Sequence, residues 1–372
     1  MAKGKLYLKR VEAIRNHLEK GDAVPPPIFV NKEETSFQNL DESSREMIKI
    51  YRQLPEYTPT LNNFHGLPQS KEFLEENIIL PLKFPGYFDN PRRIRRGVLF
   101  FGLPGTGKTH LLRAIESSIS CSFLHFSMSD FLSKYVDPET HTQRLKDAFE
   151  WTRKNYPCIL VLDDLDVLCE PNSLKDPNSI ASLIKSELVN QLQNPSPQQP
   201  VILAAAQKPW YLTGTLRRRF DRRIFCTLPD AKDRTRIFAQ NLAGAKHTLT
   251  EEELQSVGLK TENFTGADII CLARQCVMAS LQALQVATHF VKVSVSKNVD
   301  GQHVSQDMLT PCSPDEPEAI KINLEFLNIE RVLEPAVVFQ DVERALSKAS
   351  ASCLEEERKR MDKWAEEFGQ DE

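Results

Sequence analysis

One stretch of the sequence has the glycine, lysine and threonine spacing of a phosphate-binding loop, GxxxxGK[ST]. It consists of Gly102, Leu103, Pro104, Gly105, Thr106, Gly107, Lys108 and Thr109. An apolar run at 98–101 precedes the loop and a helical pattern follows it. Glycines let backbone N–H groups surround phosphate oxygens, while Lys108 would contact the β- and γ-phosphates and the Thr109 hydroxyl would hold Mg²⁺. The loop therefore predicts binding of ATP with Mg²⁺.

Two adjacent carboxylates follow a second apolar run about fifty residues later. Residues 158–162 read CILVL and lead into Asp163 and Asp164. Parallel α/β sheets present ligand-binding groups at the carboxyl ends of their strands. We expect Asp163 to organise Mg²⁺ and Asp164 to act as the base that orients or deprotonates the attacking water.

Further polar groups lie next to the later apolar runs. Gln207 comes directly after the run at 201–206, so we expect its amide to sense the γ-phosphate and the same water. Arg217, Arg218 and Arg219 precede the run at 223–228. A plain basic surface is one interpretation of these arginines; fingers inserted into the ATP site of a neighbouring subunit are the other, and they would require an oligomer.

Three further positions are assigned to the ATP site, and two others stand out by their residue types. We assign Gly66, His110 and Gly266 to the ATP site; His110 directly follows the loop, and Thr265-Gly266 opens a long apolar helix. Lys134 and Tyr135 fall in a predicted loop, where a lysine beside an aromatic residue is ordinary and by itself indicates no function.

Composition excludes several classes of protein. The chain has 372 residues, a formal net charge of −4 and 41% hydrophobic residues, which disfavours a globally basic nucleic-acid binder and whole-chain disorder. No run reaches the roughly 18 apolar residues of a membrane-spanning helix, and the first residues lack the apolar run of a signal peptide. We therefore expect a cytoplasmic protein that does not bind nucleic acid.

The distribution of apolar runs predicts an α/β fold with several parts. Strand-type runs alternate with helical patterns, which indicates a parallel sheet covered by helices on both faces. The predicted parts are an amphipathic helix at 1–20, a proline-containing linker at 21–60, an α/β nucleotide-binding domain at 61–229 and a small helical domain at 230–372, with a β insertion at about 291–330 and a final helix at about 354–369.

With these motifs the chain resembles the AAA ATPases, in the clade of katanin, spastin and the vacuolar protein sorting-associated protein 4 type. The motifs that carry this resemblance are ILPLKFP at 79–85, SDFLSKYV at 129–136, LRRRFDRRI at 216–224 and FTGADI at 264–269. The sorting type is favoured by ATHF at 287–290 with LTPCSPDEP at 309–317, by the ending KWAEEFGQDE, and by YLKRVEAIRNHLEK at 7–20, which resembles the last helix of that family's microtubule-interacting and transport domain.

The resemblance implies a ring, expected to be a hexamer, that hydrolyses ATP to pull ESCRT-III subunits through a central pore. It also implies recruitment to endosomal membranes through ESCRT-III, an activator bound at the β insertion, and a role for Lys134 and Tyr135 as the pore loop. The first twenty residues imply a truncated recruiting domain, so recruitment through a partner, a divergent helix or an incomplete gene model all stay open.

Two residues depart from the family's pattern. The second acid is normally Glu and here is the shorter Asp164, and the sensor is normally Asn and here is the longer Gln207. We hypothesise that the two changes compensate. The alternatives are a weakly hydrolysing regulatory member of a mixed ring and, with less support, a microtubule-severing ATPase.

Overall fold

A computed structural model gives the structure of the chain. It describes residues 59–83, 97–119, 121–134, 138–171, 179–193, 199–299, 302–312, 316, 318–322, 332–333 and 335–370. The helix expected at 1–20 lies outside the described residues, and so does nearly all of the linker expected at 21–60. Within the described part, no helix combines the length and apolar character needed to cross a membrane.

A five-stranded parallel sheet forms the centre of the larger domain, with strand order β2-β3-β4-β1-β5. The strands are β1 (Gly97–Phe101), β2 (Ser122–Ser127), β3 (Cys158–Asp163), β4 (Val201–Ala206) and β5 (Arg222–Phe225). Every residue of β1, β3 and β4 is buried. This burial explains why these strands read as unbroken apolar runs, since helices cover a parallel sheet on both faces.

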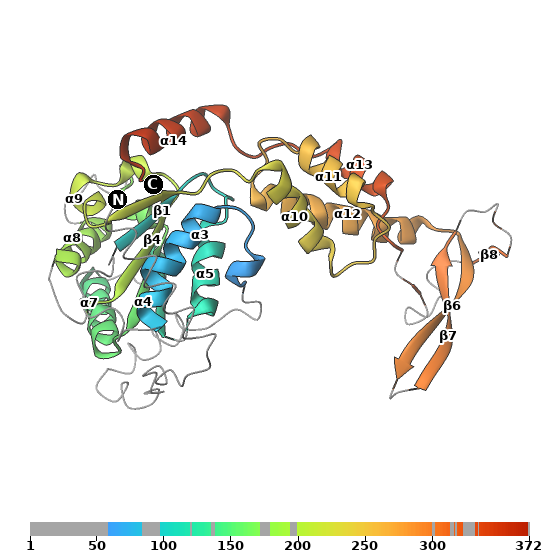
Figure 1. Cartoon of the computed structure of the whole chain (residues 1–372), viewed down its shortest axis with the longest axis horizontal. Coiled ribbons are helices and arrows are strands. Elements are labelled where there is room, and N and C mark those ends of the chain that lie inside the picture. The colour runs from blue at the N-terminus through green and yellow to red at the C-terminus, as the bar shows by residue number, and fades with distance from the viewer. Residues whose placement is uncertain are drawn as a thin grey trace, which may run out of the picture.

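Alternate residues of β1 point into two separate cores. Val98 and Phe100 join the core on one face, and Leu99 and Phe101 join the core on the other. The first face is covered by α5 (Lys108–Ser118), α3 (Pro68–Leu74), the π-helix η3 (Glu75–Ile79) and α4 (Leu80–Lys83), and the second by α6 (Met128–Lys134), α7 (Pro138–Lys154) and α8 (Ile180–Gln193). The larger domain is therefore a three-layer α/β structure (Figure 1).

A smaller helical region follows β5 in the chain. It consists of α10 (Ala231–Leu242), α11 (Glu251–Lys260), α12 (Gly266–Val286) and α13 (Phe339–Leu346), which share one apolar core. Thr250 and Thr265 begin α11 and α12 with capping boxes. A capping box pairs the exposed N–H groups of a helix's first turn, so the start of each helix is encoded locally.

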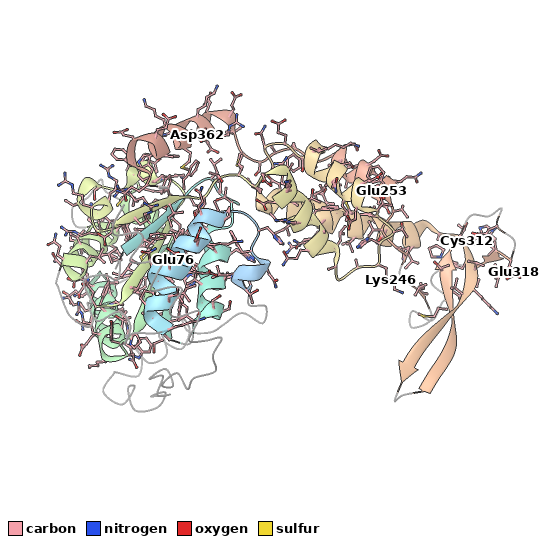
Figure 2. All side chains as sticks on the ribbon, in the orientation of Figure 1. Glu76, Lys246, Glu253, Cys312, Glu318 and Asp362 are labelled. Atoms are coloured by element: carbon pink, nitrogen blue, oxygen red, sulfur yellow. The ribbon has the colours of Figure 1, made fainter. Side chains whose placement is uncertain are left out.

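A three-stranded antiparallel sheet extends from the far end of the helical region (Figure 1). Its strands are β6 (His289–Val299), β7 (Gln302–Pro311) and β8 (Ile320–Lys321), in the order β7-β6-β8. Cys312 and Glu318 mark the base of this sheet in Figure 2. These strands overlap the stretch at about 291–330 where the sequence predicted a β insertion, and β6 begins slightly before it.

The last helix, α14 (Glu355–Phe368), lies on the larger domain and not on the helical region (Figure 1). Met361 and Trp364 are buried there, and the Trp364 ring meets Phe101 edge-on at 4.5 Å between centroids. The exposed Asp362 marks this helix in Figure 2. The sequence analysis had grouped the helix with the helical region, because an amphipathic pattern shows that one face is buried but not which surface buries it.

Candidate functional site

The phosphate-binding loop connects β1 to α5. Gly105 and Gly107 have φ angles of 78° and 94°, a backbone region in which side chains other than glycine are strained. The Lys108 ammonium is buried and donates to the carbonyl oxygens of Gly102 and Leu103, each at 2.8 Å. Burial lowers the pKa of Lys108. Local backbone geometry thus forms a loop whose N–H groups and lysine suit a chain of phosphates.

The start of α12 lies against this loop. The backbone N–H of Ala267 donates to the Gly105 carbonyl at 3.1 Å. A Cβ atom added to Gly105 would come within 2.8 Å of the Thr265 hydroxyl and 3.1 Å of the Ala267 Cβ. Glycine at position 105 therefore permits both the backbone turn and the close approach of the helical region.

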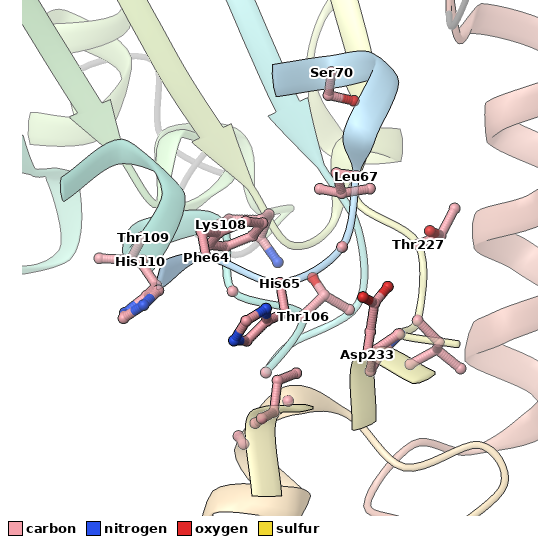
Figure 3. Close-up of a pocket in the computed structure, with 18 of the residues that line it drawn as sticks. Phe64, His65, Leu67, Ser70, Thr106, Lys108, Thr109, His110, Thr227 and Asp233 are labelled. Atoms are coloured by element: carbon pink, nitrogen blue, oxygen red, sulfur yellow. The ribbon is translucent and has the colours of Figure 1, made fainter. Parts of the chain in front are cut away.

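A pocket of about 930 Å³ lies between the loop, the segment before α3 and the helical region (Figure 3). The residues assigned from sequence that line it are Gly66, Gly105, Thr106, Gly107, Lys108, Thr109, His110, Asp163, Gln207 and Gly266. Those that do not are Gly102, Leu103, Pro104, Asp164 and the three arginines. Its volume is near the upper end of the range for small-molecule sites.

Sequence reasoning missed several residues that line this pocket, among them His65 and Asp233. His65, Thr106 and Asp233 lie around the same opening in Figure 3. Burial lowers the pKa of His65 and raises the pKa of Asp233. For His65, the only local signal in the sequence was the neighbouring Gly66 shortly before a helix. For Asp233 there was none, because it lies on α10, 167 residues after Gly66.

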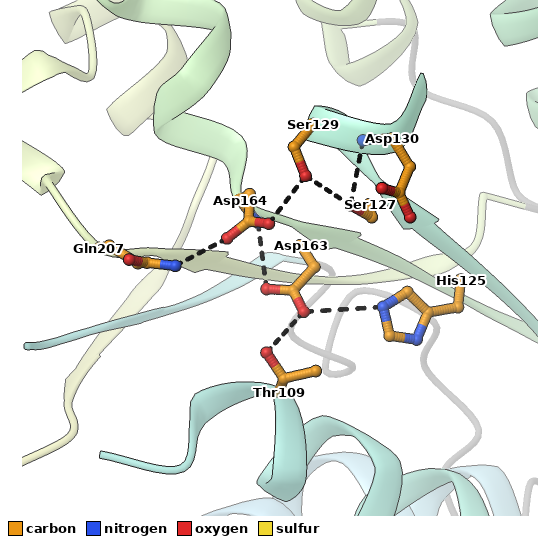
Figure 4. A network of polar contacts seen from close by, with 8 residues as sticks. All are labelled: Thr109, His125, Ser127, Ser129, Asp130, Asp163, Asp164 and Gln207. Carbon is orange, nitrogen blue, oxygen red and sulfur yellow. Dashed lines mark hydrogen bonds and ion pairs between the residues drawn. The ribbon is translucent and has the colours of Figure 1, made fainter. Parts of the chain in front are cut away.

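Asp163 lies at the carboxyl end of β3, opposite the first turn of α5 (Figure 4). The Thr109 hydroxyl donates to its Oδ2 atom at 2.7 Å, and the Nε2 atom of His125 on β2 lies 3.8 Å from the same oxygen. Burial by itself would raise the pKa of Asp163, but interactions with His125 and Thr109 outweigh it and hold the pKa below its usual value. Asp163 therefore stays ionised beside the threonine, as a cation-binding pair requires.

Asp164 is held by two side chains that come shortly after neighbouring strands, Ser129 in α6 after β2 and Gln207 directly after β4 (Figure 4). The Gln207 amide donates to its Oδ1 atom at 3.0 Å, and the Ser129 hydroxyl donates to its Oδ2 atom at 3.1 Å. Its φ of 53° is unusual for a residue other than glycine. Burial, and then the charge of Asp163, raises the pKa of Asp164. The carboxyl group of Asp164 and the amide of Gln207 thus contact each other directly.

Asp166 is a further positioning residue that the sequence analysis missed. It is buried, and its two carboxylate oxygens accept hydrogen bonds from the backbone N–H groups of Gln207 at 3.1 Å and Lys208 at 3.0 Å. These bonds tie the end of β4 to the 3-10 helix η6 (Leu165–Cys169) after β3. A third acid close to Asp163 and Asp164 was visible in the sequence, but its partners are more than forty residues away.

The arginines lie at the opposite end of the sheet from the loop. Arg217 ends α9 (Gly214–Arg217), and Arg218 and Arg219 follow it before the start of β5. Arg218 and Arg219 are exposed, whereas Arg217 is half-buried with its guanidinium 3.7 Å from the centre of the Phe368 ring. Because β5 runs parallel to β1, residues before β5 lie away from the loop that follows β1.

The pair assigned to a pore loop is described only in part. Lys134 is the last residue of α6, a helix where the sequence analysis expected a loop, and Tyr135 lies outside the described residues. At the start of α6, the backbone N–H of Asp130 donates to the Ser127 hydroxyl at 3.3 Å, and the hydroxyls of Ser127 and Ser129 share a hydrogen bond at 2.8 Å. These bonds help to begin the helix there.

Comparison with known proteins agrees with this geometry. Residues 98–228 match the ATPase family associated with various cellular activities (AAA), and residues 309–369 match the Vps4 C terminal oligomerisation domain. The chain is 34% identical to vacuolar protein sorting-associated protein 4B of Mus musculus, over 98% of this chain and 85% of the mouse protein.

A more distant relative and a solved structure extend the comparison. Vacuolar protein sorting-associated protein 4 of Dictyostelium discoideum is 31% identical over 82% of this chain and 68% of its own length. The crystal structure of the FIGL-1 AAA domain superposes with a TM-score of 0.70 at 24% identity, covering 91% of this chain and 99% of that one. With its nucleotide pocket, paired acids and matching C-terminal region, the chain belongs to the AAA ATPases, as an ATP hydrolase of the Vps4 type.

Proposed function

We propose that this chain is the building block of an ATP-driven ring that disassembles ESCRT-III filaments in endosomal and vacuolar sorting. The observation that carries the proposal is the polar network joining Thr109, Asp163, Asp164 and Gln207 beside the phosphate-binding loop. Similarity to the vacuolar protein sorting-associated protein 4 family supports the biological setting.

The residues of the pocket fit ATP with Mg²⁺. The positive φ angles of Gly105 and Gly107 give the loop a turn whose backbone N–H groups can surround phosphates. Thr109 with the ionised Asp163 supplies the hydroxyl and carboxylate oxygens that Mg²⁺ prefers. When bound, Mg²⁺ would neutralise charge on the phosphates. Lys108 adds a buried positive charge on the same side, and Gly66, His110 and Gly266, which line the pocket, would enclose the nucleotide.

Asp164 and Gln207 would prepare the attacking water together. The raised pKa of Asp164 makes it a stronger base than an exposed aspartate, and the amide at 3.0 Å orients its carboxyl group. This direct contact supports the hypothesis that the shorter acid and the longer amide compensate for each other. Asp166 would keep Gln207 in place through the backbone.

Completion of the site would come from a second copy of the chain. The arginines lie away from the loop of their own chain, so Arg217, Arg218 and Arg219 would act on the ATP of a neighbour and stabilise the charge of the transition state. Such sharing requires a ring, which we expect to be a hexamer. The match to an oligomerisation domain at 309–369 supports assembly.

The remaining parts of the proposal concern substrate and location. ESCRT-III subunits would pass through the central pore, gripped by Lys134 and Tyr135, and an activator would bind the sheet β6-β7-β8. We propose a cytoplasmic protein that reaches endosomal membranes through ESCRT-III and does not bind nucleic acid.

Steady-state ATP hydrolysis measured against protein concentration tests the proposal. We expect the rate per subunit to rise with concentration as particles assemble in ATP, and both Lys108→Ala and Arg218→Ala to abolish turnover. Mixing these two variants should restore part of the activity. Arg218→Ala copies supply an intact phosphate-binding loop, and neighbouring Lys108→Ala copies supply Arg218. A rate per subunit that is independent of concentration would contradict shared sites, and absence of binding to ESCRT-III tails would contradict the substrate.

A weakly hydrolysing regulatory member of a mixed ring is a second candidate, favoured by the two donors that already occupy both oxygens of Asp164. This function predicts tight ATP binding with little turnover at every concentration, and higher turnover when wild-type chain is mixed with a fully active relative. The dependence of the rate on concentration separates the two candidates.

A further inference from the structure

The end of α14 contacts the segment that carries Arg217. Neither the phosphate-binding loop nor the run of arginines in the sequence predicts these contacts. The Arg217 guanidinium lies 3.7 Å from the Phe368 ring centre, and the Phe368 carbonyl accepts a hydrogen bond from Arg223 Nε at 2.6 Å. The backbone N–H of Gln370 donates to the Arg223 carbonyl at 3.0 Å. One residue of the C-terminal helix thus contacts both the last turn of α9 and strand β5.

This contact engages one face of Arg217 and leaves its edge available. A guanidinium stacks on an aromatic ring through its flat face, while its five N–H donors point outward in the plane. In the described part of the chain, no hydrogen bond or ion pair involves the side chain of Arg217. A cation fixed by its face with its donors unsatisfied is suited to bind an anion from outside the chain.

The ring of Phe368 is itself fixed relative to the nucleotide loop. Phe368 contacts Trp364 at 5.3 Å between ring centres, and Trp364 contacts Phe101, the last residue of β1 before the loop. Phe101 also pairs with Phe225 of β5. The C-terminal helix therefore connects the arginine side of the domain to the strand that carries the phosphate-binding loop.

We propose that Phe368 is a positioning residue that presents the N–H edge of Arg217 to the γ-phosphate of ATP bound by a neighbouring copy of this chain. The inference rests on the proposed function, because it requires the arginines to act across a subunit interface. Arg217 then differs from the exposed Arg218 and Arg219: its orientation is set before assembly, so less side-chain entropy is lost when the neighbour's site closes.

Phe368→Leu tests the inference, because leucine keeps apolar contact but removes the aromatic face. We expect its kcat for ATP to fall about 3- to 30-fold, the range for a lost cation–π contact. The affinity for a fluorescent ATP analogue and the particle size in ATP should stay the same, since the variant's own loop is intact. Phe368→Tyr keeps the ring and should restore turnover.

A mixing experiment separates positioning from simple loss of structure. Lys108→Ala copies cannot turn over ATP but keep Phe368 and Arg217, so adding them to Phe368→Leu copies should raise the rate per Phe368→Leu subunit. Phe73→Leu is the control, because it removes another contact of an arginine with a phenylalanine ring, that of Arg222 at 5.1 Å from the ring centre, in the same domain. That control should leave turnover unchanged.

Each other outcome overturns the inference. Turnover of Phe368→Leu within twofold of wild type shows that Arg217 needs no positioning. Loss of assembly without rescue by Lys108→Ala copies shows a purely structural contact. In parallel, rescue of Arg218→Ala by Lys108→Ala with no rescue of Phe368→Leu would overturn this inference alone, whereas failure of both mixtures would overturn the shared site itself.

Discussion

The carboxylates after β3 and the arginines before β5 occupy opposite ends of the same parallel sheet, and their surroundings differ. Asp163, Asp164 and Asp166 each accept hydrogen bonds from groups of this chain. Arg218 and Arg219 are exposed, and in the part of the chain that the structure describes their side chains form no ion pair.

This difference separates groups that one copy of the chain organises by itself from groups that, in the proposed ring, act together with a second copy. The acids are fixed by side chains and backbone groups of the same chain, so their geometry exists in the single chain. The arginines carry positive charge that nothing in the described chain neutralises, and only Arg217 is oriented, through Phe368. Exposed arginines without a partner in their own chain are expected on the surface of a protein whose catalytic centre forms between subunits.

The largest effect should come from the loop. Lys108→Ala removes the buried ammonium that would contact the phosphates, so we expect ATP binding and turnover to fall about 100-fold or more. Fluorescent nucleotide titration and steady-state hydrolysis measure both quantities. Lys154→Ala, which removes an exposed lysine paired with Glu150 at 2.7 Å, is the control and should behave as wild type. Binding by Lys108→Ala within tenfold of wild type would contradict the assignment of the pocket.

The next largest effect should be on stability, at the acidic end of the sheet. Asp166→Ala leaves the N–H groups of Gln207 and Lys208 without acceptors, and we expect it to lower the free energy of unfolding by about 1–3 kcal/mol. Chemical denaturation measures the change, with the exposed Asp362→Ala as control. Equal stability of the two variants would mean that water satisfies both N–H groups.

A double-mutant cycle sharpens the description of the acidic end. Because Asp164 and Gln207 are 3.0 Å apart, we expect the rates of Asp164→Glu, Gln207→Asn and the double variant to be non-additive, with a coupling of about 0.5–3 kcal/mol. The double variant should be more active than the two single changes predict. Additivity within about 0.5 kcal/mol would remove the compensation hypothesis.

The smallest effect should come from the arginine end of the sheet. Arg218→Ala and Arg219→Ala remove exposed side chains that have no partner among the described residues, so the free energy of unfolding should change by less than about 0.5 kcal/mol. The same denaturation experiment, at low protein concentration without nucleotide, checks this. Destabilisation as large as that of Asp166→Ala would show that the arginines hold the single chain together, and the contrast between the two ends would fail.

Local features of the sequence were sufficient for the loop and for the sheet class. The spacing from Gly102 to Thr109 defines the loop because its geometry depends on glycine φ angles and on the start of one helix. Asp163 and Gln207 could be placed near it because parallel strands end at one edge, and each residue lies at the end of a buried strand or directly after it.

Contacts between distant segments could not be predicted in this way. His125 approaches Asp163 only because β2 pairs with β3, and Asp166 holds Gln207 across 41 positions of the chain. Each of these side chains is compatible with many surroundings, and its partner is fixed by sheet order. The sequence patterns contain the strands but not the order in which they pair.

The sequence by itself determined the chemistry of this protein: a glycine-rich loop, two acids, an amide and three arginines. Tertiary structure decided how the parts are combined, including the attachment of α14 to the α/β domain and of Arg217 to Phe368, 151 residues later in the chain. The physical reason is range: backbone dihedrals and helix caps act over a few residues, whereas burial of an apolar face is satisfied by whichever surface the whole fold brings to it.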